Sequence, residues 1–290
     1  MTSSTSSSLP DLTGRTVIVT GATSGVGRAT AAALAGAGAR VVLAVRNEAK
    51  AADVVGEIRR RHPAATVEVR ALDLADSASV RAFSAAWSDP VDVLINNAGV
   101  MATSRTETTD GFELQFGTNH LGHFLLTTLL LPLIGDRVVV VASDAHRWGH
   151  LDLDDPQWER RRYRGFGAYG QSKLANLLFT LELDKQLRPT GRRALAVHPG
   201  WVRSGLGLGQ HGSLASGLSQ GAGSLFGQSP EAGARPTLVA VTQDLPGSSY
   251  VGPDGLGANR GEPTLIGRSR EAGDAALARR LWELSERLTR

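Results

Sequence analysis

Short apolar runs alternate with longer segments of helical periodicity along most of the chain. The runs are rich in valine and isoleucine and show little polar alternation, which is typical of strands that are buried on both faces. We expect strands at residues 16–20, 40–45, 66–69, 91–95, 137–141 and 195–197. We expect helices at residues 28–35, 48–61, 77–87, 112–131, 168–187 and 272–288. This order predicts an α/β fold with a doubly wound parallel β-sheet and helices on both faces.

Two segments depart from this alternation. Residues 1–10 are polar and rich in serine and threonine, which predicts a disordered tail before a single domain at residues 11–290. Residues 205–227 are rich in glycine and serine but retain several leucines, so we expect a mobile apolar flap over a substrate site. The most apolar stretch, residues 124–134, is shorter than the roughly 20 residues of a membrane span. No membrane span is expected.

Composition limits the chemistry that is available. The chain has 290 residues, of which 41% are hydrophobic, so it can bury a sizeable core. It contains no cysteine, which excludes catalytic thiols and thiolate metal sites and favours a cytoplasmic location. The net charge is only +3, and basic residues alternate with acidic ones, so the pattern does not indicate nucleic-acid binding. Redox chemistry on a small-molecule substrate would need a dissociable cofactor.

A glycine-rich turn follows the first expected strand, with the sequence T-G-A-T-S-G-V-G at residues 20–27. Gly21 allows a tight reversal, Gly25 allows the backbone to approach a pyrophosphate, and Gly27 allows the next helix to pack closely. Glycines also end strands without any ligand, but an apolar strand before the turn and a helix after it favour dinucleotide binding. We therefore predict a single Rossmann-like domain in which Thr23, Ser24 and Val26 complete the cofactor turn.

The second expected strand ends at Val45 and is followed by Arg46. An acidic residue near this point would bind the ribose 2′-hydroxyl of NAD(H) and would repel a 2′-phosphate. A guanidinium can instead bind the phosphate, and such charged hydrogen bonds contribute roughly 1.5 to 3 kcal/mol. The sequence favours NADP(H) over NAD(H). The alternative is a surface arginine that only caps the strand.

Tyr169 and Lys173 are four residues apart on an expected helix, so their side chains share one face. A positive charge beside a phenol favours the phenolate, so we expect Lys173, together with an oxidised nicotinamide, to lower the pKa of Tyr169. Tyr169 could then exchange a proton with a substrate oxygen during hydride transfer. Ser143, at the end of the fifth expected strand, could donate a hydrogen bond to the same oxygen. This tyrosine–lysine spacing is common by chance, and its meaning depends on the surrounding motifs.

Taken together, these motifs give the chain a resemblance to the short-chain dehydrogenase/reductase superfamily over nearly its whole length. Within that superfamily it is most similar to the group of retinol dehydrogenases, WW-domain oxidoreductases and protochlorophyllide reductases. The closer likeness is carried by the stretches N-H-L-G-H-F-L-L-T at residues 119–127, Y-G-Q-S-K-L-A-N-L-L-F-T at 169–180, H-P-G-W-V at 198–202, G-P-D-G at 252–255 and R-L-W-E-L-S-E-R-L-T at 280–289.

The resemblance implies roles for further residues. Asp73 would accept a hydrogen bond from the adenine with help from the Leu74 backbone, although the same stretch is also a helix N-cap signal. Asn119 would hold a water that links Lys173 to solvent, which would make it catalytic together with Ser143, Tyr169 and Lys173. Lys173 would also bind the nicotinamide ribose beside Tyr169. The remaining implied cofactor contacts are Asn96, Ala98, Gly99, Pro199, Gly200, Val202 and Ser204.

Histidine pairs and a basic run allow other readings. His120 with His123, and His146 with His150, have metal-like spacing, but no carboxylate cluster completes either set, so we expect no metal. The run at residues 160–164 lies in an insertion between Ser143 and Tyr169. It could contact an acidic surface, but nearby aspartates favour a solvated loop. Oligomeric state cannot be predicted, although the helix at 168–187 is apolar enough for a homo-oligomer contact.

The leading hypothesis is an NADP(H)-dependent oxidoreductase that acts on a carbonyl or alcohol of a lipophilic or aromatic substrate. One alternative is a catalytically silent NADP(H)-binding sensor or scaffold, which would be expected to lose Tyr169, Lys173 or Ser143. Another is a nucleotide-sugar epimerase or dehydratase, which should show a different glycine spacing and a larger C-terminal domain. The substrate and the physiological direction cannot be read from the sequence.

Overall fold

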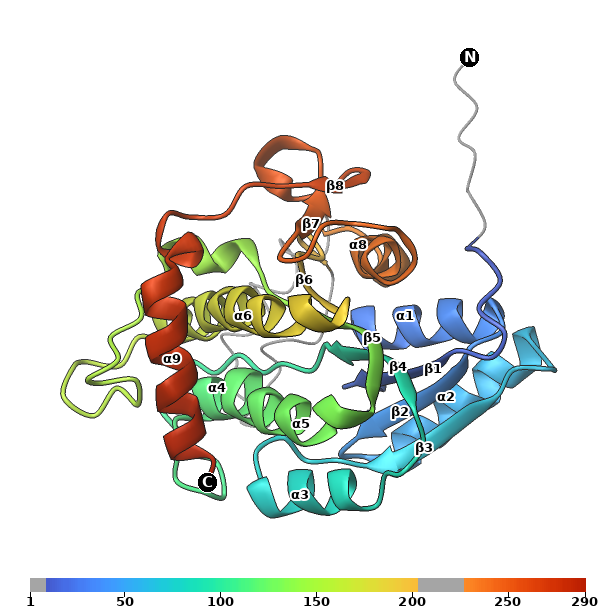
Figure 1. The fold of residues 1–290 in the computed structure, drawn as a ribbon, viewed down its shortest axis with the longest axis horizontal. Coiled ribbons are helices and arrows are strands. Elements are labelled where there is room, and N and C mark those ends of the chain that lie inside the picture. The colour runs from blue at the N-terminus through green and yellow to red at the C-terminus, as the bar shows by residue number, and fades with distance from the viewer. Residues whose placement is uncertain (1–8, 203–226) are drawn as a thin grey trace, which may run out of the picture.

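The computed structural model describes residues 9–202 and 227–290, which form a layered α/β structure around one sheet (Figure 1). The sheet has eight strands in the order β3-β2-β1-β4-β5-β6-β7-β8. All neighbouring pairs are parallel except β7 with β8, which are antiparallel. The strands are β1 (Thr16–Thr20), β2 (Arg40–Val45), β3 (Val67–Ala71), β4 (Val91–Asn96), β5 (Ile134–Val141), β6 (Arg193–Val197), β7 (Tyr250–Pro253) and β8 (Pro263–Leu265). The predicted doubly wound parallel sheet is confirmed.

Each central strand sends alternate side chains to opposite faces of the sheet, and both faces are covered by helices. In β1, Val17 and Val19 join one core cluster whereas Ile18 joins the other. The first cluster packs under α1 (Gly25–Gly36), α2 (Glu48–Arg61) and α8 (Pro230–Thr242). The second packs under α3 (Ser77–Ala85), α5 (Gly122–Leu130) and α6 (Gly165–Leu187). Burial on both faces explains the apolar runs without alternation.

The C-terminal helix α9 (Ala275–Leu288) packs against α5 and α6 (Figure 1). Its Trp282 lies with ring centroids 4.8 Å from Phe124 and 5.8 Å from Phe179. Ser285 of the same helix lies 2.8 Å from His120 Nε2. The second apolar face of α6, in which the sequence suggested a subunit contact, is therefore covered in part by α9 of the same chain.

Several predicted boundaries were wrong. The helix expected at 112–131 is divided into α4 (Leu114–Phe116), a π-helical turn at Gly117–Leu121, and α5. The helix expected at 272–288 begins at Ala275, and the strand expected at 66–69 runs from Val67 to Ala71. The elements α8, β7 and β8 were missed, although Ser229 followed by Pro230 is a helix-start signal, and Ser229 Oγ does accept from the Ala232 amide. The short strands β7 and β8 lie at the sheet edge, where few residues carry the pattern.

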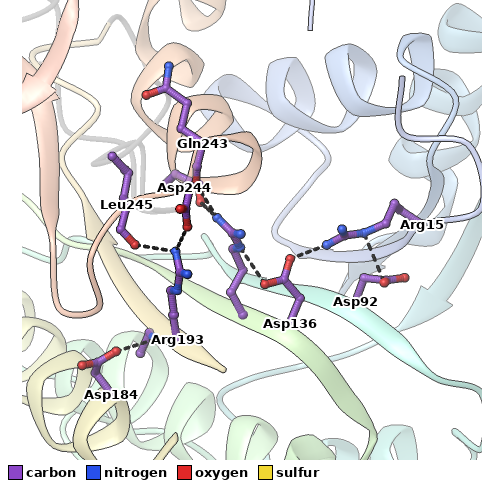
Figure 2. A network of polar contacts seen from close by, with 11 residues as sticks. Arg15, Asp92, Asp136, Asp184, Arg193, Gln243, Asp244 and Leu245 are labelled. Carbon is purple, nitrogen blue, oxygen red and sulfur yellow. Dashed lines mark hydrogen bonds and ion pairs between the residues drawn. The ribbon is translucent and has the colours of Figure 1, made fainter. Parts of the chain in front are cut away.

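A network of ion pairs and backbone contacts lies at the amino-terminal edge of the sheet (Figure 2). Asp136 of β5 pairs with Arg15 and with Arg137, whose Nε lies 3.1 Å from Asp136 Oδ1. Arg15 also pairs with Asp92 of β4 at 3.1 Å. Arg137 donates to the Gln243 carbonyl at 2.8 Å, which ties β5 to the end of α8. These contacts fix the strands relative to one another at the edge where the parallel strands begin.

Candidate functional site

The predicted site residues gather at the opposite edge, where the parallel strands end. The chain turns from β1 toward β2 on one side and later places β4 on the other side of β1, so the strand order reverses beside Thr20. In open α/β sheets, ligands bind outside the carboxyl ends of the strands at such a reversal. The fold therefore brings the turn after β1 and the segments after β4, β5 and β6 to one cleft edge.

The glycine-rich turn has the close contacts that its glycines predict. Gly21 has φ of +66° and lies against Ala98, so a Cβ there would meet both a strained backbone and a clash at 2.8 Å. A Cβ on Gly27 would lie 2.3 Å from the Asn97 side chain. Asn97 Nδ2 donates to the Thr20 carbonyl at 2.8 Å, as expected of a structural bridge. Ser24 precedes α1 and makes no side-chain cap, so the first amide groups of the helix are left to face a ligand.

Arg46 directly follows β2 and is exposed. In the described part of the chain its side chain makes no hydrogen bond, and the next residue, Asn47, caps α2 by accepting from Lys50 N at 2.9 Å. Asn47, not Arg46, is therefore the N-cap of α2. Arg46 thus lies exposed at the carboxyl end of β2, and its role in binding a ribose 2′-substituent stays a prediction.

Asp73 and Leu74 follow β3 at the same edge. The Asp73 carboxylate accepts from Ala75 N at 2.9 Å and its own amide donates to Ser79 Oγ at 2.9 Å. The N-cap of α3 is Asp76, which accepts from Ala78 N, so the capping signal in this stretch belongs to Asp76 and not to Asp73. Asp73 is only half-buried and its second carboxylate oxygen can still accept from a ligand.

Asn119 lies buried in the π-helical turn and contacts the segment after β4. Its Oδ1 accepts from Val100 N at 2.7 Å, and its Nδ2 donates to Val100 O at 2.9 Å and to Ser172 Oγ at 3.0 Å. A Cβ on Gly99 would stand 3.5 Å from both Asn119 Oδ1 and Lys173 Nζ. The segment after β4 thus approaches the α6 lysine at Gly99. Asn96 itself is fully buried and donates to Thr127 Oγ1 at 2.8 Å.

Tyr169, Lys173 and Ser143 come together at the start of α6 and the end of β5. The Lys173 ammonium lies 5.6 Å from the centre of the Tyr169 ring, as the four-residue spacing predicted. It donates to the Val141 carbonyl at 3.0 Å, two residues before Ser143. The Ser143 hydroxyl accepts from Ala145 N at 3.2 Å and forms a hydrogen bond that lowers the pKa of Tyr169.

The net pKa shifts of the pair are set by burial. Burial raises the pKa of the Tyr169 phenol to about 12, and the Ser143 hydrogen bond opposes this only in part. Burial also lowers the pKa of the Lys173 ammonium to about 8. In the chain alone, loss of hydration therefore sets the direction of the pKa shift of Tyr169. The expected lowering of this pKa by Lys173 together with an oxidised nicotinamide stays a prediction. A neutral phenol at neutral pH can donate a proton.

The segment after β6 lies at the same carboxyl edge of the sheet and contacts α8. Gly200 has φ of +74°, and Gln228 donates to the Pro199 carbonyl. Val202 pairs with Gln228 in a short bridge, and its side chain faces Gly233 of α8 together with that of Val26 from the glycine-rich turn. Two predicted cofactor segments are thus adjacent. Ser204 and the predicted flap at 205–227, apart from Gly227, lie outside the described residues.

The histidines serve local packing. His120 Nε2 contacts Ser285, and His146 Nδ1 lies 2.7 Å from the Ser143 carbonyl while its Nε2 accepts from Ser269 N at 3.1 Å. Burial lowers the pKa of His120 to about 3 and also lowers that of His146. Among residues 9–202 and 227–290, no three side chains of metal-ligating type form a group.

The insertion before Tyr169 is anchored to the body of the protein. The Arg161 guanidinium lies 3.9 Å from the centre of the Trp158 ring and pairs with buried Asp155. Tyr163 donates to Glu113 at 2.8 Å and accepts from Gln115 at 2.8 Å. Part of the basic run is therefore structural, and these contacts fix the start of α6.

Three features of the site were not predicted. Ser172 supports Asn119, and Thr20 supports the turn: its Oγ1 accepts from the amides of Asn97 and Ala98, each at 2.9 Å. The third feature is an exposed aromatic pair, Trp148 and Phe166, with ring centroids 5.6 Å apart. The sequence could have indicated Phe166, because it lies three residues before Tyr169 and positions i and i+3 share a helix face.

Fold and site together define a dinucleotide-binding α/β oxidoreductase. The chain belongs to the short-chain dehydrogenase family. The model of that family, described as short chain dehydrogenase, matches residues 15–209. Human (Homo sapiens) retinol dehydrogenase 13 is 45% identical over 95% of this chain and 84% of its own length. A crystal structure of an uncharacterized protein from Mycobacterium Paratuberculosis is 49% identical, with a TM-score of 0.82 over 97% of this chain and 95% of that one.

A more distant similarity concerns the fold alone. Pseudomonas aeruginosa RhlG, solved as an active-site complex with NADP, is 23% identical with a TM-score of 0.65 over 83% of this chain and 94% of that one. The chain is therefore a retinol dehydrogenase-like member of a family of oxidoreductases that use a nicotinamide cofactor. None of the described helices is both long and apolar enough to cross a membrane.

Proposed function

We propose that this protein is an NADP(H)-dependent oxidoreductase that acts on a carbonyl or alcohol of a lipophilic or aromatic substrate, with Tyr169 as the acid–base. The observation that carries the proposal is the convergence of Tyr169, Lys173 and Ser143 beside the glycine-rich turn. The bound cofactor would supply the hydride in reduction and accept it in oxidation. In this proposal all remaining chemistry belongs to side chains of the chain itself.

In reduction, the Tyr169 phenol would donate its proton to the substrate oxygen while Ser143 donates a hydrogen bond to that oxygen. The raised pKa keeps Tyr169 protonated at neutral pH, which supports reduction as the favoured direction. Lys173 would hold the phenolate that forms, because its ammonium lies on the same helix face. In oxidation the same groups would act in reverse, and the rate would rise with pH as Tyr169 loses its proton.

The residues at the cleft edge suit a nicotinamide dinucleotide. Gly21 and Gly27 let the turn pack closely against Ala98 and Asn97, and the start of α1 has no side-chain cap, which suits a pyrophosphate at the helix N-terminus. At the other end, a Cβ added to Gly99 would stand 3.5 Å from both Lys173 Nζ and Asn119 Oδ1, so these residues gather where a nicotinamide ribose would be bound. These two features support a cofactor that spans the carboxyl edge of the sheet.

Preference for NADP(H) rests on Arg46. It is exposed at the end of β2, and the preceding residue is Val45 instead of an acid. One or two hydrogen bonds to a 2′-phosphate would favour NADPH over NADH by about 10- to 200-fold. Equilibrium titration of the wild type and of Arg46→Asp with both cofactors tests this. Equal affinities in the wild type, or a preference that Arg46→Asp leaves intact, would refute it.

The substrate class rests on the aromatic pair of Trp148 and Phe166. Their side chains are 64% and 49% exposed, and unlike a single exposed apolar residue they lie together as a pair. Phe166 precedes Tyr169 by one helical turn, and Trp148 follows Ser143 by five residues. We therefore expect both rings to border the predicted reacting groups. The names of the curated retinol dehydrogenase relatives support the same class, an extended apolar alcohol or aldehyde.

A close crossing of backbones holds this pair in place. A Cβ on Gly149 would lie 2.2 Å from the Gly170 carbonyl carbon, and one on Gly170 would lie 2.8 Å from Gly149 N. Only glycine at both positions lets the turn after β5 touch α6. The contact sets Trp148, next to Gly149, over the first turn of α6, where Phe166 lies.

The proposal is tested by steady-state turnover of a carbonyl panel with NADPH and with NADH. The panel should include retinal, a steroid ketone, a quinone and a small aliphatic aldehyde. We expect turnover of at least one apolar member with NADPH. If NADPH binds and no member is reduced, nor the matching alcohols oxidised, then the catalytically silent sensor is the better account.

A further inference from the structure

Two buried residues with no role in the proposal, Thr20 and His123, join the glycine-rich turn to the π-helical turn. Thr20 is the last residue of β1 and His123 lies in the first turn of α5. His123 Nε2 lies 2.9 Å from Thr20 Oγ1, and its Nδ1 lies 3.0 Å from the backbone carbonyl of Asn119. Both side chains are almost completely buried.

The chemistry of these groups fixes where each proton lies. A carbonyl oxygen only accepts, so His123 Nδ1 carries the proton that it donates to Asn119 O. Burial lowers the pKa of His123 to about 4, and the ring is neutral at physiological pH. Its Nε2 must then accept, and the Thr20 hydroxyl donates to it at 2.9 Å in preference to the Ile95 carbonyl, which lies farther away at 3.3 Å. Thr20 Oγ1 in turn accepts from the Asn97 and Ala98 amides.

One directed chain of hydrogen bonds results. It runs from the amides after β4, through Thr20 and His123, to the carbonyl of Asn119. The Asn119 side chain is held separately by Val100 and Ser172. Asn119 is therefore fixed at both its backbone and its side chain by groups outside the π-helical turn. The family resemblance implies that Asn119 holds a water that links Lys173 to solvent, so the position of Asn119 bears on the proton path.

We propose that His123 is a positioning residue that holds the Asn119 carbonyl in register with the glycine-rich turn, so that cofactor and proton path keep a fixed relative position. A π-helical turn leaves its carbonyls less uniformly bonded than an α-helix does, so an external donor can define one of them. The inference rests on the proposed function, because it concerns the proton path of Tyr169 and Lys173.

The test compares two variants at position 123 with one control variant at His120. His123→Leu removes both hydrogen bonds. His123→Asn places an amide near the position of Nδ1 and keeps the donor to Asn119 O. We expect His123→Leu to lower kcat about tenfold at saturating substrate and cofactor, and to displace the pH at which carbonyl reduction declines. His123→Asn should recover most of kcat and the wild-type pH profile.

His120→Leu is the matched control. His120 is also buried and neutral and lies three residues before His123, but its ring is hydrogen-bonded to Ser285 of α9. We expect a lower Tm with unchanged kcat and pH profile. The proposal is overturned if His123→Leu behaves like His120→Leu, or if His123→Asn is as slow as His123→Leu.

A second readout separates this inference from the proposed function. Thr20→Val and His123→Leu are combined in a double-mutant cycle on the Kd for NADPH, which needs no turnover. If the two residues act through one chain, the double variant should bind NADPH about as weakly as the worse single variant. Multiplicative losses would contradict the chain of hydrogen bonds even if Tyr169 is confirmed. Absence of all turnover with a non-additive cycle would refute only the proposed function.

Discussion

The two ends of strand β2 carry arginines in opposite states. Arg40, its first residue, donates to Glu68 at 3.0 Å and to Asp89 at 2.7 Å, and these hydrogen bonds raise its pKa. Arg46, just past its last residue, is exposed and makes no side-chain hydrogen bond within residues 9–202 and 227–290. Arginine thus forms ion pairs at one edge of the sheet, whereas at the other edge it makes no side-chain hydrogen bond with the described residues.

The contrast extends across the sheet. At the amino-terminal edge, each charge in the network of Figure 2 faces an opposite charge or a backbone polar group. At the carboxyl edge, Lys173 is 2% exposed and donates to the Val141 carbonyl, and burial lowers its pKa to about 8. Charges are neutralised where only stability is required. They are left under-compensated where a ligand or a transition state is to be bound.

The largest effect is expected when Lys173, the buried charge at the carboxyl edge, is replaced. Lys173→Met should lower turnover at least about 1000-fold, because Tyr169 loses the charge that holds its phenolate. It should also stabilise the protein by roughly 2 kcal/mol at pH 7, since burying the ammonium costs about 3 kcal/mol and its hydrogen bond returns about 1. Chemical denaturation with a turnover assay measures both.

The same variant has a pH signature. The folded pKa of Lys173, about 8, lies below the unfolded value of 10.5, so the unfolded chain binds the extra proton between these values. Wild-type stability should therefore contain a contribution that rises from about pH 8 to 10.5 and that Lys173→Met lacks. A variant that is less stable than the wild type at every pH would contradict the claim of a strained, under-compensated charge.

The aromatic pair tests how far the carboxyl edge reaches. Trp148→Ala and Phe166→Ala should each raise KM for a long apolar substrate by about tenfold, as removal of a buried aromatic contact does. KM for a small aliphatic aldehyde should stay within about twofold. Leu129→Ala, an exposed leucine of α5 away from the predicted site, is the control and should change neither value. Equal effects on both substrates would remove the pair from the substrate site.

The smallest effect is expected at the amino-terminal edge. Asp136→Ala leaves Arg137, whose side chain is 11% exposed, without its carboxylate. The partly exposed pair limits the expected loss to about 1 to 2 kcal/mol of unfolding free energy. Turnover and cofactor affinity at a temperature where the variant is folded should equal those of the wild type. A changed KM would show that the two edges are coupled.

Sequence patterns predicted the features that repeat or have a motif. The apolar runs predicted most ends of β1, β2, β4 and β5 to within one residue, although β5 begins three residues earlier than expected. The glycine-rich turn lies where the motif indicated. The division of the 112–131 helix was not predictable from periodicity, because a π-helical turn leaves the apolar pattern almost unchanged. The raised pKa of Tyr169 in the chain alone was not predictable for a similar reason: residue spacing shows a neighbouring charge but not the loss of hydration.

Histidine chemistry shows the same limit. The spacing of His120 and His123 suggested a possible metal pair, whereas the structure gives each ring a different hydroxyl partner, Ser285 and Thr20. Those partners come from α9 and β1, which are far away in sequence. Contacts of this kind depend on the tertiary structure, and they decide which buried polar residue supports the site.

The central claim is tested most directly by the single-turnover rate of NADPH oxidation with an apolar carbonyl substrate, measured for the wild type and for Tyr169→Phe at saturating cofactor. The proposed role of Tyr169 predicts a wild-type rate that declines as pH rises through the pKa of the phenol, and a variant rate at least about 1000-fold lower at neutral pH. Equal rates, with NADPH bound equally well by both proteins, would contradict it.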